Sequence, residues 1–336
     1  MNTQPLIGLM LGDPTGIGPE ISVKLLASGA AADARLVVFG DARVLELGMR
    51  DAGVSVPYQT YTQVDDVATD AEGISVIDLA NMDPAALARG QVSEVSGRVC
   101  GETLKVMIEA ALAGHIDGIC FAPLNKAALH RGGWRFHDEH QMFANLTAHS
   151  GFFGEMNVIP EFATFRVTSH VALREAVNMI TAERIASAVR LADDTLKDMG
   201  CARPRIGVAA LNPHCGENGL FGDEEIRIIR PTVEELQASG LDLIGPLSSD
   251  TIFLRAKRGE FDGVVMMYHD QGQIATKLLG FNRGVTVTAG LETVFATPAH
   301  GTAFDIVGKG AADPGALRYA VRLAARLAAA RMGATP

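Results

Sequence analysis

Three histidines, His170, His214 and His269, have surroundings that could make them metal ligands. Each closely follows an apolar stretch, in the segments VTSHV, LNPHCGE and MMYHDQG. In α/β folds, ligands and catalytic groups gather at the carboxyl ends of strands, and imidazole is a good ligand for divalent metals. Three imidazoles at such ends could converge on one ion. Any one of them alone fits a hydrogen-bonded core or surface side chain better, so the spacing leaves both interpretations open.

A second candidate is the turn GDPTGIGPE at residues 12–20, which directly follows an apolar run. Glycine lets a backbone approach a ligand closely, and a glycine-rich turn that opens a helix can bind a nucleotide. The spacing is not the GxGxxG of dinucleotide-binding folds. Ordinary turn chemistry is therefore the favoured interpretation.

Alternating strands and helices must position these residues. Short apolar runs predict buried strands at residues 6–11, 36–39, 74–77, 116–120, 205–210 and 263–267. Helix-like segments are found at 19–27, 94–113, 181–199, 223–239 and 314–331. The alternation predicts an α/β fold with parallel strand pairs and helical crossovers. Gly/Pro-rich joints near 130–134 and 298–301 predict the crossings between two lobes.

The composition limits the possible partners. A chain of 336 residues with 48% apolar content can bury a core large enough for two domains or lobes. The net charge of −10 argues against nucleic acid as the main partner. No apolar run reaches the roughly 18–20 residues that cross a bilayer, so we expect no membrane partner. The absence of a signal peptide and of any CxxC pair predicts reduced thiols in the cytoplasm, at Cys100, Cys120, Cys201 and Cys215.

Six segments, taken together and in order, resemble the 4-hydroxythreonine-4-phosphate dehydrogenase family. They are GDPTGIGPE, PLNKAALHRGG, LNPHCGENGLFGDEE, GPLSSDTIF, YHDQGQIATKLLGFNRGV and HGTAFDIVGKGAADPGA. The similarity runs from near residue 7 to near residue 320 and so covers nearly the whole chain. The last segment also resembles the adenosine-binding loop of the isocitrate and isopropylmalate dehydrogenases.

The resemblance implies a two-lobed fold like isopropylmalate dehydrogenase, with a central cleft. We expect one lobe of residues 1–130 plus 300–336 with the cofactor loop, and another of residues 131–299 with the metal, substrate and dimer contacts. It also implies a homodimer whose subunits together supply His170, His214 and His269 to one divalent metal per subunit, either Zn²⁺, Mg²⁺, Mn²⁺ or Co²⁺. Such an ion would lower the pKa of the substrate hydroxyl. Hydride would pass to NAD or NADP, and a β-keto product would lose CO₂.

Further roles follow from the resemblance, residue by residue. The catalytic candidates are Lys126, in PLNKAAL, and two acids expected near the metal, Asp250 and Asp270. Lys277 in IATKLLG matches a substrate-binding lysine; without the resemblance it would be interpreted as a solvated lysine, and Asp250 as a helix cap. The loop HGTAFD is expected to receive the adenosine half of the dinucleotide through His300, Gly301, Thr302 and Asp305.

The chain departs from the family at substrate-binding positions. Glu139 and His140 replace a His-Thr pair, while Thr286 and Phe295 replace an asparagine and an arginine that help hold substrate. Losing that arginine would forfeit a charge-assisted contact of roughly 1.5–3 kcal/mol to a phosphate. The departures favour a paralogue that oxidises a non-phosphorylated hydroxy acid, such as an aromatic cis-dihydrodiol carboxylate, with Phe295 against its ring.

Two alternatives stay open. A phosphorylated substrate is possible if new residues rebuild the anion site, and the candidates are Arg166, Arg135, Arg283 and His140. A protein of another class, which binds metal and ligand without catalysis, is disfavoured because the histidine trio, Lys277 and the HGTAFD loop are all present.

Overall fold

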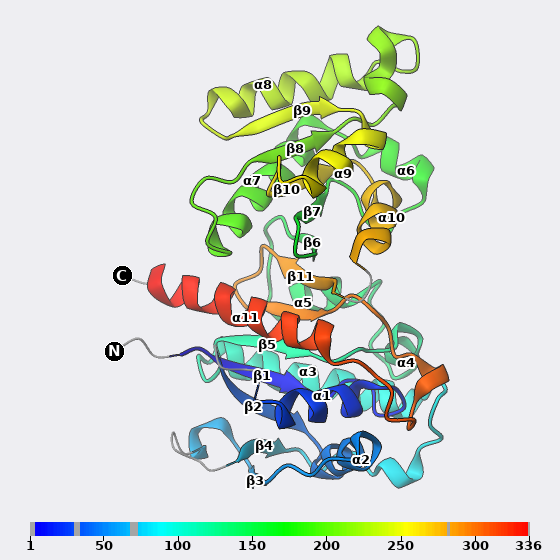
Figure 1. The fold of residues 1–336 in the computed structure, drawn as a ribbon, viewed down its shortest axis with the longest axis vertical. Helices are drawn as coiled ribbons and strands as arrows, with labels where there is room; N and C mark the ends of the chain where they lie inside the picture. Colours follow the sequence, from blue (N-terminus) through cyan, green and yellow to red (C-terminus); the bar gives the residue numbers. More distant parts are fainter. Residues whose placement is uncertain (1–3, 30–33, 68–72, 281–282, 335–336) are drawn as a thin grey trace. The chain divides into compact units, whose positions relative to one another are not determined.

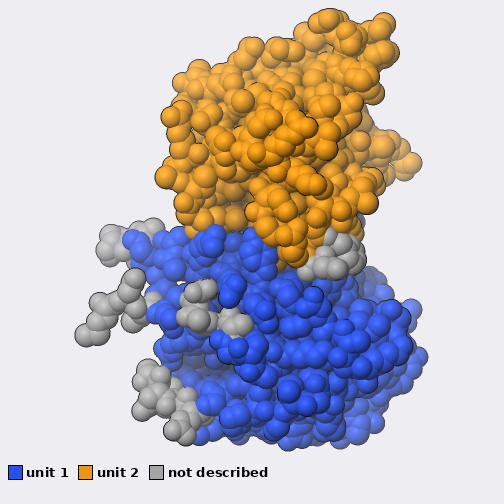
Figure 2. Space-filling view, viewed as in Figure 1, with its two compact units in different colours: residues 1–150, 291–336 blue, residues 151–290 orange. Residues whose placement is uncertain are grey.

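The computed structural model describes residues 4–29, 34–67, 73–280 and 283–334. The chain forms two compact units: unit 1 contains residues 1–150 and 291–336, and unit 2 contains residues 151–290 (Figure 2). The predicted lobe boundaries, at 131 and 300, both fall inside unit 1. Among the described residues, no helix is both long and apolar enough to cross a membrane.

Unit 1 is built on a parallel sheet with the strand order β3-β4-β2-β1-β5-β12 (Figure 1). Its strands are β1 (Leu6–Met10), β2 (Arg35–Gly40), β3 (Tyr58–Tyr61), β4 (Ile74–Asp78), β5 (Gly118–Phe121) and β12 (Phe295–Pro298). Its helices are α1 (Gly18–Ala27), α2 (Ala42–Ala52), α3 (Glu94–Leu112), α4 (Lys126–Arg131), α5 (Glu139–Leu146) and α11 (Gly315–Ala334). Helices cover the central strands, which explains why β5 is buried along its whole length.

Unit 2 contains a mixed sheet with the order β11-β6-β7-β10-β8-β9. Strand β6 is antiparallel to both of its neighbours. Strands β7, β10, β8 and β9 are parallel to one another. The strands are β6 (Gly154–Val158), β7 (Ala163–Arg166), β8 (Ile206–Ala209), β9 (Leu243–Leu247), β10 (Gly263–Met266) and β11 (Val285–Ala289). The helices are α6 (Leu173–Asn178), α7 (Ala182–Asp198), α8 (Arg230–Ala238), α9 (Ser249–Lys257) and α10 (His269–Gly280).

All six strands predicted from apolar runs are present, as β1, β2, β4, β5, β8 and β10. The five predicted helices are present as well, and the one at 223–239 begins as a π-helix, Glu225–Ile229, before α8. The predicted α/β class is therefore confirmed.

Side-chain caps start the two short helices that carry predicted site residues in unit 1. Asn125 accepts a hydrogen bond from the backbone of Ala128, at 2.9 Å, so α4 begins at Lys126. Asp138 likewise accepts from the backbone of Gln141 at 2.9 Å, at the start of α5. Such caps satisfy backbone donors that the first helical turn leaves free. They fix where each short helix begins, and hence where its first side chain emerges.

Helix α4 also depends on a glycine contact with α3. A Cβ on Gly97 would lie 1.8 Å from the backbone oxygen of Ala128. Because backbone cannot move aside as a side chain can, we expect Gly97→Ala to destabilise the protein by about 1–3 kcal/mol, measured by urea unfolding. The matched control is Gly333→Ala in α11, where nothing lies within 4 Å of the added atom. Equal stability of the two variants would contradict this account of the α3–α4 contact.

Candidate active site

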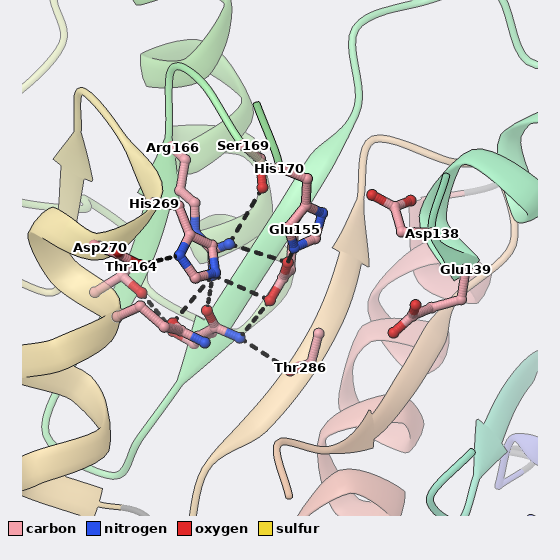
Figure 3. A network of polar contacts seen from close by, with 12 residues as sticks. Asp138, Glu139, Glu155, Thr164, Arg166, Ser169, His170, His269, Asp270 and Thr286 are labelled. Carbon is pink, nitrogen blue, oxygen red and sulfur yellow. Dashed lines mark hydrogen bonds and ion pairs between the residues drawn. The ribbon is translucent and has the colours of Figure 1, made fainter. Parts of the chain in front are cut away.

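His170 and His269 lie side by side in unit 2 (Figure 3). Their ring centroids are 5.4 Å apart, and both residues line a cavity of about 200 Å³. His170 follows β7, and His269 begins α10 just after β10. Because β7 and β10 are neighbouring parallel strands, their carboxyl ends bring the two imidazoles to one edge of the sheet. His170 has a left-handed backbone, with φ of 45°, a strained conformation of a kind that clusters at functional sites.

Asp270 orients the ring of His269. The Nδ1 atom of His269 lies 2.6 Å from Oδ1 of Asp270, which leaves Nε2 for another partner. Burial lowers the pKa of His269; Asp270 opposes this shift, and the Arg166 cation adds to it. The lowered pKa favours a neutral ring near pH 7, which is the form that binds a metal.

A buried ion pair lies against His170. The guanidinium of Arg166 and the carboxylate of Glu155 form a bidentate pair, with both N···O distances at 3.0 Å. The two side chains are 1% and 9% exposed, and Oε2 of Glu155 is also 3.7 Å from Nε2 of His170. Because Glu155 compensates its charge, Arg166 is not free to hold a phosphate. This pairing argues against a role for Arg166 in rebuilding an anion site, and that role stays a prediction.

The ion pair belongs to a polar network across three strands (Figure 3). The Arg166 guanidinium also donates to side-chain oxygens of Asn157, Ser169 and Gln273. Asn157 in turn donates from Nδ2 to Oγ1 of Thr286, at 2.9 Å. Thr286, a predicted substrate residue, is 9% exposed. The network thus connects that position on β11 with the ion pair beside the histidines.

Gln271 ties the start of α10 to two other elements. Its Nε2 donates to the backbone oxygen of Ala210 at 2.6 Å and to Oγ of Ser249 at 2.8 Å. Its Oε1 accepts from the backbone of Met267 at 2.7 Å. These bonds join the ends of β8 and β10 to the first turn of α9. Asp250, a predicted acid near the metal, is exposed in that turn.

His214 lies outside the histidine pair, exposed in a left-handed turn. The residues from His214 to Asn218 have φ between 43° and 74°, a run that costs about 1–2 kcal/mol for each residue other than glycine. Fully buried Glu225 anchors the segment before the turn by accepting from the backbones of Leu211 and Asn212, at 2.8 and 2.7 Å. Within the described part of the chain, no group of three His, Cys, Asp or Glu side chains is arranged to hold a metal.

The other predicted cations of unit 2 lie on its surface. Lys277 is exposed in the last turn of α10. Arg283 is paired with Glu161, with an N···O distance of 3.0 Å. The charge of Lys277 is thus the more accessible of the two for a ligand.

A second cavity, of about 250 Å³, lies in unit 1. Lys126 and Glu139, the first residues of α4 and α5, both line it, and their Nζ and Oε2 atoms are 3.1 Å apart. The lysine side chain is 59% exposed and the glutamate side chain is 15% exposed. An accessible amine beside a mostly buried carboxylate can exchange a proton with a ligand. Arg135, near this cavity in sequence, is exposed.

His140 and Phe295 belong to the core of unit 1. Phe295 is 1% exposed, and its ring stacks on Phe143 with centroids 4.2 Å apart. His140 is 5% exposed and packs edge-on against Phe143. Because Phe143 covers one face of the Phe295 ring and the residue is almost fully buried, this packing argues against a substrate ring lying on Phe295, and the predicted role stays untested. The burial of His140 likewise argues against its holding an anion, and that role also stays a prediction.

The HGTAFD loop, which was predicted to receive the dinucleotide, continues without a break to Ala312, and residues 300–312 together form the cofactor loop. This loop packs on the Gly-rich turn of residues 12–20. The backbone of Ile17 donates to the oxygen of Thr302 at 3.1 Å. A Cβ on Gly16 would lie 2.8 Å from Cβ of Thr302, so only glycine permits this approach. Thr302 is 7% exposed, whereas Gly301 and Asp305 are exposed and His300 is half-buried.

Two buried acids fix the Gly-rich turn. Oδ1 of Asp13 accepts from the backbone and hydroxyl of Thr15, at 2.8 and 2.7 Å, and from the hydroxyl of Ser96. Glu20 accepts from Lys24 and from the backbone of Ala312. Neither acid was a sequence candidate. For Asp13, a carboxylate shortly after an apolar strand was an available signal; Glu20 lies inside α1, and nothing in the sequence singles it out.

Comparison with known proteins decides the family. A family model described as "Pyridoxal phosphate biosynthetic protein PdxA" matches residues 32–324. The chain belongs to the PdxA family. A D-threonate 4-phosphate dehydrogenase from Cupriavidus necator is 42% identical over 330 residues, which cover 97% of this chain and 98% of the relative. A Pseudomonas aeruginosa protein, provisionally named 4-hydroxythreonine-4-phosphate dehydrogenase 2, is 45% identical over 336 residues, covering 96% and 97%.

Solved structures agree with this membership of the PdxA family. A 4-hydroxythreonine-4-phosphate dehydrogenase from Burkholderia phymatum is 41% identical, with a TM-score of 0.80 over 97% of this chain and 98% of that one. A terephthalate 1,2-cis-dihydrodiol dehydrogenase from Burkholderia xenovorans LB400 is 28% identical, with a TM-score of 0.67 over 96% and 98%. The predicted family is confirmed, and so is the predicted class of enzyme, an oxidoreductase that acts on a CH–OH group.

Three positioning residues of this PdxA-family chain were missed from the sequence. Glu155 lies in β6, which was not predicted. Gln271 and Glu225 lie inside the segments YHDQGQ and LNPHCGENGLFGDEE, beside the histidines that drew attention. Their proximity in sequence to candidate metal ligands was the available signal, a close one for Gln271 and a weak one for Glu225.

Proposed function

We propose that this chain oxidises the carbinol group of a hydroxy acid 4-phosphate in a metal-dependent reaction with NAD⁺ or NADP⁺, and that the β-keto acid formed then loses CO₂. The observation that carries the proposal is the placement of His170 and His269, 5.4 Å apart beside one cavity. Full-length similarity to dehydrogenases named for phosphorylated acids supports the substrate class.

The residues present fit a divalent metal. His170 and His269 offer imidazole nitrogens, and the carboxylate at Nδ1 of His269 is the kind of partner that orients a metal-binding histidine. Imidazole suits Zn²⁺ and Co²⁺ better than the hard ion Mg²⁺, with Mn²⁺ between them. When bound, such an ion would act as a Lewis acid on the substrate hydroxyl.

The chain's own groups then have distinct tasks. Asp270 binds Nδ1 of His269, which leaves Nε2 of that ring free to face a ligand. The Arg166–Glu155 pair lies against His170, with Oε2 of Glu155 3.7 Å from Nε2 of His170. We propose that Lys126 exchanges a proton with the substrate, that Asp250 is a second acid–base group, and that Lys277 attracts its anionic end. The loop at 300–312 would bind the adenosine half of the dinucleotide.

We also propose a homodimer in which His214 completes the metal site across the subunit contact. Its exposure, and its separation from the other two histidines within one chain, support this arrangement. Large apolar side chains are exposed nearby, with Leu220 at 71% and Phe221 at 49%. Exposed apolar side chains of this size are typical of surfaces that bind another protein. The four free cysteines support a cytoplasmic location.

The substrate class is tested by NAD⁺ and NADP⁺ reduction with metal-loaded protein. We expect kcat/KM for D-threonate 4-phosphate or 4-hydroxythreonine 4-phosphate to exceed that of the dephosphorylated compound by about 100-fold or more. Two lost charge-assisted hydrogen bonds of about 1.5–3 kcal/mol each would account for at least that ratio.

The comparison compounds separate the alternatives. Turnover of an aromatic cis-dihydrodiol carboxylate alone would contradict the phosphate proposal and favour the chemistry for which the B. xenovorans enzyme is named. Ligand and metal binding with no reduction of either dinucleotide would favour a non-catalytic protein.

A further inference from the structure

One lysine and one glutamate outside the cofactor loop fix its carboxyl-terminal end. The Nζ atom of Lys24 donates to the backbone oxygens of Gly310 and Ala312, both at 2.8 Å. Oε1 of Glu20 accepts from the backbone of Ala312 at 2.8 Å and from Lys24 at 2.7 Å. Glu20 is fully buried and the lysine side chain is 22% exposed. Three backbone groups of the loop are therefore bonded to a charged pair on α1.

The amino-terminal part of the loop is fixed by the same segment of chain. Ile17, immediately before α1, donates its backbone N–H to Thr302, as described above. Thr15 accepts from the backbone of Gly90 at 2.9 Å, and a Cβ on Gly90 would lie 3.3 Å from the backbone oxygen of Phe304. The Gly-rich turn and α1 together hold both ends of the loop.

Between these fixed ends, the loop has a few hydrogen bonds of its own, which include a bond from the Lys309 backbone to the backbone oxygen of Ile306 at 3.2 Å and a contact of His300 Nδ1 with the backbone oxygen of Gly301 at 3.1 Å. Ile306 donates to the backbone oxygen of Ala303 at 3.1 Å, and Lys309 donates to that of Asp305 at 2.7 Å. Ala303 has a left-handed backbone, with φ of 43°, which costs free energy in any residue except glycine. A strained stretch with sparse internal bonding keeps one conformation only if its ends are held.

We propose that Glu20 and Lys24 are positioning residues for the dinucleotide: the pair holds the 300–312 loop in the conformation that binds it. The inference rests on the proposed function of this loop. It also gives the Gly-rich turn a purpose, which is to support the binding loop. If releasing the pair leaves only about a tenth of the loops in the binding conformation, the apparent Kd for the dinucleotide rises about tenfold.

The test uses the charge-balanced variant Glu20→Gln/Lys24→Met in the full-length protein. Gln can still accept from Ala312, so the variant removes the lysine bonds without leaving a buried charge unpaired. The matched control is Asp193→Asn/Lys197→Met, which removes an i,i+4 pair of the same spacing in α7 of unit 2, with an N···O distance of 2.6 Å. Dinucleotide Kd, KM and kcat, metal affinity, and hydrogen exchange of the loop are measured for wild type and both variants.

We expect Kd and KM for the dinucleotide to rise about tenfold in the test variant only, with kcat within about threefold of wild type. Metal affinity should not change, and amides of 303–312 should exchange faster. Unchanged dinucleotide affinity in the test variant, or an equal rise in the control, would overturn the inference. A parallel fall of metal affinity and kcat would also overturn it, because a general loss of structure would then be the cause. If wild type neither binds nor reduces a dinucleotide, the proposed function itself has failed, a result that is visible before any variant is compared.

Discussion

Replacing His170 or His269 with alanine is expected to lower kcat/KM by about a thousandfold. A metal ion stabilises transition-state charge by several kcal/mol, and each factor of ten in rate corresponds to about 1.4 kcal/mol. Because both rings face one cavity, loss of either should also weaken binding of Zn²⁺ or Co²⁺. The two effects are measured by NADH formation and by competition with a chromophoric chelator.

The control for these variants is His115→Ala. His115 is 37% exposed and is paired with Asp65 on the surface of unit 1, at 3.0 Å, so its loss should leave metal affinity and activity unchanged. Full metal affinity in both His170→Ala and His269→Ala would refute the metal site.

His170→Ala, combined with His214→Ala, also tests whether two subunits share one metal site. His214→Ala should be as inactive as His170→Ala, yet co-expression of the two chains should restore about a quarter of wild-type activity. Half of the random dimers are mixed, and each mixed dimer keeps one intact site if the two histidines come from different subunits. No recovery would place all the ligands within one chain or show that the third ligand is another residue.

Replacing Arg166 with methionine should destabilise the protein by about 3–5 kcal/mol, because it leaves the Glu155 carboxylate buried without a cation. Glu155 is 9% exposed and both of its oxygens bond to the guanidinium. Removing both charges, in Glu155→Met/Arg166→Met, should recover much of the loss, since a buried ion pair contributes little compared with apolar side chains. Unfolding by urea, followed by circular dichroism, measures both variants.

The exposed pair Arg283–Glu161 is the matched comparison. Its side chains are 55% and 29% exposed, so Arg283→Met should cost only about 0–1 kcal/mol. If Arg166→Met were no more destabilising than Arg283→Met, the buried Glu155 carboxylate would not need the Arg166 cation. Its guanidinium would again be a candidate for holding a substrate anion.

The sequence predicted six strands from their apolar runs, but it missed others that are also largely apolar, such as β9, LIGPL. Strand β5, with the sequence GICF, is buried throughout, and burial on both faces of a parallel sheet requires such a run. Strands β6 and β7, with the sequences GEMNV and ATFR, gave no such signal. Glu155 and Arg166 look like surface residues in the sequence, and only their pairing allows both to be buried.

The sequence by itself determined the α/β class, the family and the histidines worth testing, because apolar runs and ordered motifs are local properties of the chain. Tertiary structure alone decided which groups meet. His170 and His269 are neighbours because β7 pairs with β10, a contact between segments about a hundred residues apart. It also decided that Arg166 is neutralised and that Phe295 is covered, since the availability of a charge or a ring depends on what packs against it.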